Sequence, residues 1–173
     1  MTILDRFLGH DAWTTRQLLL RCRELSDEQL ARKFDIGDRS LHQTFEHIIA
    51  AMESHTDFLL GRSASPREGT SLDALLARLT IVAKDFSEFA TRVEREGRAD
   101  EMATNLKGGN RRSLGGVITH VVTHGMHHRA QAIFMMEQLG LQDVIEGDVL
   151  GWEAVTRGWG WPDGGSEGEM VVG

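Results

Sequence analysis

The chain of 173 residues is 40% hydrophobic and 26% charged, values typical of one soluble globular domain with a substantial core. Its formal net charge of −7 argues against a nucleic-acid-binding surface, which needs a dense basic patch, and the short stretch 107–112 is the nearest approach to one. No stretch approaches the roughly 18 apolar residues that cross a bilayer, and the N-terminus lacks a signal-peptide profile, so we expect no membrane partner and a cytoplasmic location.

A first helix is predicted over residues 3–24, where apolar residues recur at helical spacing. It contains Cys22, the single cysteine, which excludes an intrachain disulfide and a thiolate metal cluster and is expected to pack in the core. Ser26 followed by Gln29 is a capping box, and it predicts a short helix that ends at about Lys33.

The second long helix is predicted to begin at Ser40, which forms another capping box with Gln43, and to end at Gly61. Spacings of three and four residues separate the positions that we expect to face the bundle: Leu41, Phe45, Ile48, Met52, His55 and Leu59. A third helix is predicted over residues 71–96, after a loop that contains Gly, Ser and Pro.

The helical pattern breaks after the third helix. The sequence Lys107-Gly108-Gly109-Asn110 predicts a tight turn, as in a small hairpin. Ser113 can cap a fourth helix that is predicted to run to about Leu139. Residues 141–173 are rich in Trp and Gly, and we expect an irregular segment that packs on the bundle through its rings and then frays. The three tryptophans of this segment are Trp152, Trp159 and Trp161.

Four long helices with mostly short connections predict an all-α fold: an antiparallel four-helix bundle with a longer third connection and a short extra helix. The bundle is expected to occupy about residues 1–140 of a single domain spanning residues 1–173. Residues 141–173 are its C-terminal extension, and no internal repeat of solenoid length is present.

Four of the eight histidines lie close together on the predicted fourth helix: His120, His124, His127 and His128. At about 100° per residue they share one face of that helix, and Gln131 extends the same stripe. The other faces are largely apolar, which is typical of a buried helix, so the stripe is expected to point into the bundle.

Several buried imidazoles need hydrogen-bond partners, and one metal ion can satisfy them together. His124 and His128 have the i, i+4 spacing that lets two imidazoles bind one ion from a single helix. His47, in the middle of the second long helix, is the leading candidate for a third ligand. The alternative is that these histidines are hydrogen-bonded core residues.

The other histidines give weaker signals. His42 is expected to be solvated, His55 to fill space between helices, and His127 to pack or to form hydrogen bonds, while His10 has no surroundings that suggest a role. For His120 two interpretations stay open: it orients a metal ligand or the substrate, or it is a satisfied core histidine. Gln131 is a candidate for the same orienting role.

Three segments of the chain resemble motifs of the DinB-like superfamily. Residues 119–132, T-H-V-V-T-H-G-M-H-H-R-A-Q-A, resemble its signature helix, which carries H-x-x-x-H-R-G-Q. Residues 10–16 are similar to its first-helix motif, and residues 40–48 to its second-helix motif, which ends on a ligand histidine. The chain departs from the family at Ala130, which replaces Gly, and at His55, which stands where tryptophan is common. It also has Thr14-Thr15 in place of the expected Asn.

The resemblance implies a metal-binding four-helix bundle whose three ligands fall on His47, His124 and His128. It implies one divalent ion, zinc or nickel, with iron or manganese as alternatives, and a homodimer. Related members are thiol-dependent S-transferases or isomerases, so the implied reaction joins a low-molecular-weight thiol to a small electrophile. A metal-dependent hydrolase is an alternative, although the sequence supplies no convincing base, since Glu46 points about 100° away from His47. A non-catalytic stress-response or metal-binding protein is the other alternative.

Overall fold

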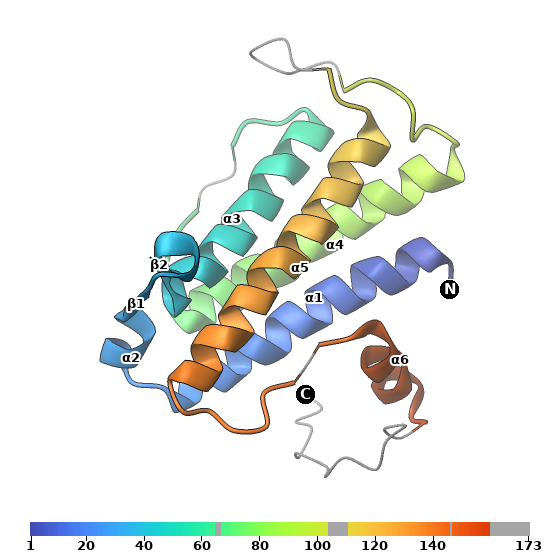
Figure 1. Cartoon of the computed structure of the whole chain (residues 1–173). Helices are drawn as coiled ribbons and strands as arrows, with labels where there is room; N and C mark the ends of the chain where they lie inside the picture. Colours follow the sequence, from blue (N-terminus) through green and yellow to red (C-terminus); the bar gives the residue numbers. More distant parts are fainter. Residues whose placement is uncertain (65–66, 104–110, 146, 160–173) are drawn as a thin grey trace.

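The computed structural model describes residues 1–64, 67–103, 111–145 and 147–159. Four long helices make up most of it: α1 (Ile3–Arg21), α3 (Leu41–Leu60), α4 (Leu72–Arg95) and α5 (Leu114–Gln138). The shorter elements are η1 (Cys22–Glu24), α2 (Asp27–Ala31), β1 (Lys33–Phe34), η2 (Ile36–Asp38), β2 (Arg39–Ser40) and α6 (Val149–Arg157). The predicted all-α helical bundle is confirmed (Figure 1).

The helices begin at the capping residues that the sequence predicts. Ser40 accepts a hydrogen bond from the backbone of Gln43, whose side chain accepts one from the backbone of Ser40. The same reciprocal pair forms between Ser26 and Gln29. Ser113 caps α5 through the backbone N–H of residue 116. These local contacts satisfy backbone N–H groups that a helix terminus leaves unpaired, so they determine where each helix begins.

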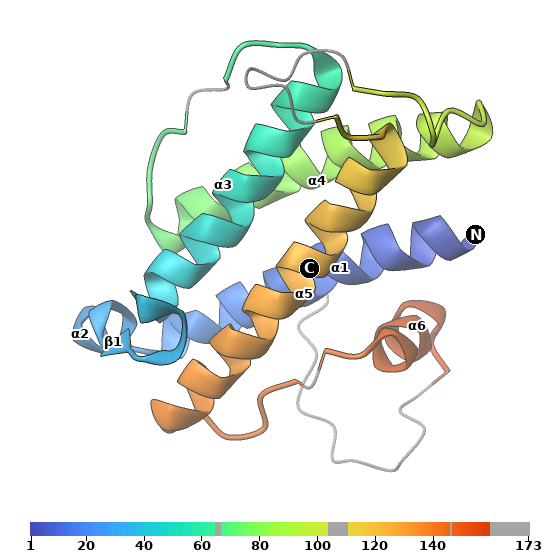
Figure 2. The ribbon, with the colours of Figure 1, turned by 45° about the horizontal axis from the view of Figure 1, so that its top comes forward.

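Helices α3 and α4 are parallel neighbours, whereas the sequence predicted an antiparallel bundle with a longer third connection. The imidazole of His42 donates a hydrogen bond to the carbonyl of Thr70, just before α4, and Glu53 pairs with Arg78 further along. The residue numbers of the contacting partners therefore rise together along the two helices, as they do in parallel helices. The start of α4 therefore lies beside the start of α3 (Figure 2).

The antiparallel arrangement does hold between α3 and α5. Thr44 contacts the sulfur of Met135 near one end of this interface, and the rings of His55 and His120 lie close together toward the other. The residue numbers of the contacting partners fall along α5 as they rise along α3. The midpoints of the two helices are therefore brought side by side, and this is where the histidines lie.

The core lies between the four long helices and receives side chains from each of them. Fully buried examples are Leu18, Leu19, Phe45, Ile48, Leu75, Phe86, Val117 and Met135. Cys22 is also fully buried, and burial raises the pKa of its thiol to about 12. The expectation that Cys22 packs in the core is confirmed, and such a thiol is a poor nucleophile.

The C-terminal segment is more regular than the sequence suggests, because residues Val149–Arg157 form α6 beside α1 (Figure 1). Trp152 is buried and packs against Gly9, where an added Cβ atom would lie 2.5 Å from the ring. Trp159, by contrast, is 66% exposed. Trp161 and the predicted turn at residues 107–110 lie outside the described residues. Within the described ranges, no helix combines the length and the apolar character needed to cross a membrane.

Candidate metal centre

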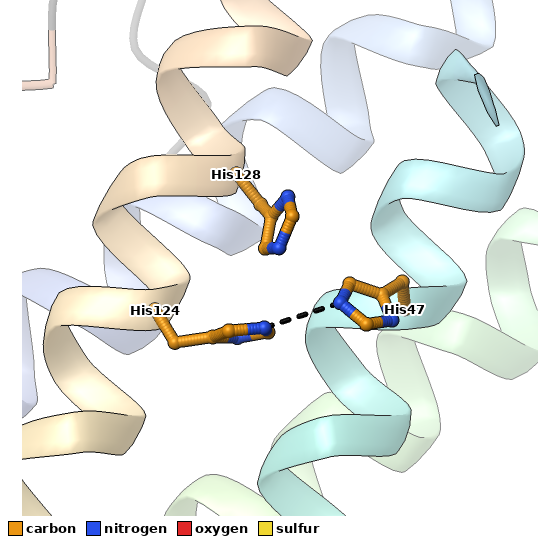
Figure 3. A group of neighbouring side chains, drawn as sticks. All are labelled: His47, His124 and His128. Atoms are coloured by element: carbon orange, nitrogen blue, oxygen red, sulfur yellow. Dashed lines mark hydrogen bonds between the residues drawn. The ribbon is translucent and has the colours of Figure 1, made fainter. Parts of the chain in front are cut away.

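Three histidines from two helices converge on one point between α3 and α5 (Figure 3). His47 comes from α3, and His124 and His128 come from successive turns of α5. One ring nitrogen of each lies within 4.8 Å of the others, and Nε2 of His47 is 3.1 Å from Nε2 of His124. Nitrogens that share a tetrahedral ion at about 2.1 Å lie about 3.4 Å apart, so this group could hold a metal ion.

The sequence suggested that the histidine stripe of α5 points into the centre of the bundle. In the structure the stripe instead faces α3 at the side of the bundle. His128 is buried, His47 and His124 are half-buried, and His120 and His127 are exposed. The centre of the bundle is filled by the apolar side chains of the neighbouring faces of the helices. A group at the side of the bundle is supported by packing on one side and accessible to a ligand on the other.

All three imidazoles of the group favour their neutral form. Burial, followed by the charges of neighbouring histidines, lowers the pKa of His124 to about 4. Burial likewise lowers the pKa of His47 and of His128, and the nearby guanidinium of Arg39 adds to both shifts. Because only a neutral imidazole can ligate a metal, the electrostatics of the group keep it ready for an ion at neutral pH.

Gln131 orients His128. Nδ1 of His128 donates a hydrogen bond of 2.8 Å to Oε1 of Gln131, and the amide nitrogen of Gln131 lies 3.2 Å from Nε2 of His127. The turn at Gly37, between β1 and β2, packs against the same amide, with φ of 73° at Gly37. Donation from Nδ1 leaves the Nε2 lone pair of His128 free to bind an ion.

His120 lies outside the three-histidine group but next to it. Its ring centroid is 5.5 Å from that of His124 and 5.2 Å from that of His55. Because His120 is exposed, the interpretation of a satisfied core histidine is wrong. His55 is half-buried and its Nδ1 lies 2.8 Å from the carbonyl of Ala51, so it does more than fill space.

Two further histidines have partners that the sequence did not predict. His42 was expected to be solvated, but its Nε2 donates to the carbonyl of Thr70, because α4 begins beside α3. Buried His10 contacts the carbonyl of Gly147 through Nε2, which connects α1 to the segment that leads into α6. Both contacts are structural and lie away from the three-histidine group.

A buried ion pair lies behind the histidine helix, and sequence reasoning missed it. Arg129 of α5 pairs with Asp11 of α1, and both side chains are at most 3% exposed. The same guanidinium donates to the hydroxyl of Thr15 at 3.2 Å. Two features of the sequence could have revealed this pair. One is an arginine opposite the histidine stripe of an otherwise apolar helix, and the other is an aspartate in the first-helix motif.

A comparison with family models matches residues 1–151 to the model described as the DinB family. Among solved structures, the chain is similar to a DinB-like protein from Bacillus cereus, with a TM-score of 0.60 and 20% identity. That match covers 79% of this chain and 89% of the other, and at this identity it shows the fold alone. Curated proteins give no match.

Proposed function

This chain belongs to the DinB family, and we propose that it binds one divalent metal ion through His47, His124 and His128. The observation that carries the proposal is the convergence of three ring nitrogens within 4.8 Å of one another. Lowered pKa values and the hydrogen bond from His128 to Gln131 support it, since both keep ligand lone pairs available. Zinc and nickel suit an all-imidazole donor set best, with iron and manganese as alternatives.

We further propose that the site serves thiol transfer to a small electrophile. Three protein ligands leave at least one coordination position open, which is typical of catalytic sites. A divalent ion bound there would lower the pKa of a thiol or a water molecule. Among the described residues, the three-histidine group consists of imidazoles and contains no carboxylate. This favours a thiol, which ionises near pH 8.5 and needs less assistance than water.

The first test is the metal content of the protein purified without a histidine tag, measured by elemental mass spectrometry. We expect about one zinc or nickel ion per chain, and its loss in His124→Ala. His42→Ala is the matched control, because His42 lies on α3 and is bonded to Thr70, away from the group. Metal that is absent from the wild type, and is not taken up on reconstitution, would overturn the proposal.

The second test separates the reactions. Thiol transfer predicts metal-dependent conjugation of a low-molecular-weight thiol to an electrophile such as a maleimide-like or epoxide substrate, at a rate that saturates with the thiol. A hydrolase would instead turn over an ester substrate without any thiol. A non-catalytic metal-binding protein would do neither, but would lose stability on chelation. The homodimer implied by family resemblance is tested separately by light scattering of the metal-loaded protein.

A further inference from the structure

His55 and His120 form a second pair of facing imidazoles across the same helix interface. His55 lies two turns beyond His47 on α3, and His120 lies one turn before His124 on α5. Their ring centroids are 5.2 Å apart, with an angle of 51° between the ring planes. The pair lies in a hollow between the two helices, lined also by Ala51 and Met52.

The separation of the two rings suits a shared ion. Two imidazoles that bind one tetrahedral ion, each with a metal–nitrogen distance of about 2.1 Å, have ring centroids about 5 Å apart. The rings of the three-histidine group, by comparison, are 4.4–4.9 Å apart. The centroid separation of 5.2 Å between His55 and His120 is therefore compatible with two rings that share one ion.

The orientation of His55 is fixed in a form that can ligate. Its Nδ1 donates a hydrogen bond of 2.8 Å to the carbonyl of Ala51 on the same helix. Metal-binding imidazoles commonly donate their other N–H to a backbone carbonyl in this way, which fixes both the tautomer and the ring. Nε2 of His55 consequently carries the free lone pair.

We propose that His55 and His120 form a second, weaker binding site for a divalent transition-metal ion, next to the three-histidine group. Two nitrogen ligands select zinc, nickel or copper over magnesium or calcium, which prefer oxygen. Because His120 is exposed and His55 only half-buried, solvent can fill the remaining coordination positions. The site does not depend on the proposed function, since it shares no ligand with the three-histidine group.

The test is a calorimetric titration of metal-free, tag-free protein with zinc, repeated with copper. We expect a tight binding event followed by a weaker one. His55→Gln and His120→Gln should each abolish the weaker event while a tight event persists, whereas His124→Gln should abolish the tight event. Both substituted side chains reach solvent, so the variants are expected to fold, and circular dichroism checks this. His42→Gln is the matched control, because His42 lies on α3 and is hydrogen-bonded to the carbonyl of Thr70.

The two proposals fail in different ways. A weaker event that persists in both His55→Gln and His120→Gln, or that is absent from the wild type with both metals, overturns the second site. If the wild type shows the weaker event but no tight event, the proposed function is overturned and the second site is still supported. A weaker event that disappears in His42→Gln as well would show that its loss is not specific to His55 and His120, and this also overturns the proposal.

Discussion

Gly125 of α5 lies directly on Asp11 of α1: a Cβ atom added at Gly125 would be 2.7 Å from Oδ1 of Asp11. It would also be 3.0 Å from Nη1 of Arg129, so this glycine allows the buried ion pair to form between the helices. The residue immediately before Gly125 is His124. The close approach of α1 and α5 therefore helps to set the position of the histidine helix.

Replacement of Gly125 by Ala is expected to destabilise the protein. Alanine favours a helix by about 1 kcal/mol over glycine, whereas overpacking a buried contact costs about 1–3 kcal/mol. Because the obstructing atoms belong to a buried ion pair that cannot move into solvent, we expect a net loss of about 1 kcal/mol, measured by urea denaturation. Met126→Ala, at an exposed position of the same helix, is the control. A Gly125→Ala variant more stable than the wild type would contradict this reading.

Breaking the buried pair between Asp11 and Arg129 is expected to be more costly. Removal of one partner leaves an uncompensated buried group, and such changes cost about 3–5 kcal/mol. Burial already raises the pKa of Asp11 against the opposing effect of Arg129, so loss of the guanidinium raises it further. We expect Arg129→Met to show this loss in urea denaturation, and Asp11→Leu/Arg129→Met to recover part of it. Arg23→Ala, which removes an exposed pair with Asp73, should change the free energy of unfolding by less than about 1 kcal/mol.

Gln131 is expected to affect metal affinity without ligating the ion. Loss of a side chain that orients a ligand histidine typically weakens metal binding by about 10–100-fold. Gln131→Leu removes the acceptor for Nδ1 of His128, so we expect a weakening of that size in a competition titration with a zinc chelator. Gln138→Leu, at an exposed position of α5, is the control and should bind zinc as the wild type does. Equal affinities in the two variants would rule out the orienting role.

The metal-free protein is expected to lose stability as the pH falls from about 6.5 toward about 4. The pKa of His124 is about 4 in the folded state and near 6.5 when unfolded, and those of His47 and His128 are also lowered. In this pH window the unfolded chain therefore binds more protons than the folded chain does. Protonation stabilises the unfolded state more, so the free energy of unfolding falls. Above pH 6.5 both states are neutral at these groups and the effect disappears. The measurement is urea denaturation in the presence of EDTA, with the His47→Gln/His124→Gln/His128→Gln variant as the reference. The free energy of unfolding should depend less steeply on pH in the variant than in the wild type.

Helix α6 is expected to depend on Trp152 for its attachment to α1. Burying a tryptophan contributes about 3–5 kcal/mol relative to alanine, and this ring packs on Gly9. In Trp152→Ala we expect the amides of α6 to lose hydrogen-exchange protection while those of α3 and α5 keep theirs. Trp159→Ala should leave protection unchanged, because Trp159 is 66% exposed. Retained protection of α6 in Trp152→Ala would mean that other contacts, such as that of Arg6 with Glu153, hold it.

The sequence alone predicted much of the fold, because helix boundaries depend on residues that are close together along the chain. Ser40, Gly61 and Ser113 were recognisable as capping and terminating residues, and each acts as predicted. The approach of His124 and His128 follows likewise from their spacing on one helix. His47 was the leading candidate for the third ligand from its place in the middle of the second long helix, and the motif resemblance pointed to the same residue.

What the sequence could not determine is how distant segments meet. The parallel packing of α3 and α4, the contact of His55 with His120 and the pair of Asp11 with Arg129 each depend on the direction and register of two helices. The side of the bundle on which the histidine stripe lies depends on the same packing. Helical periodicity and caps are set by interactions within about four residues, so they can be read locally. Register between helices is set by the packing of the whole core, and only the tertiary structure decided it.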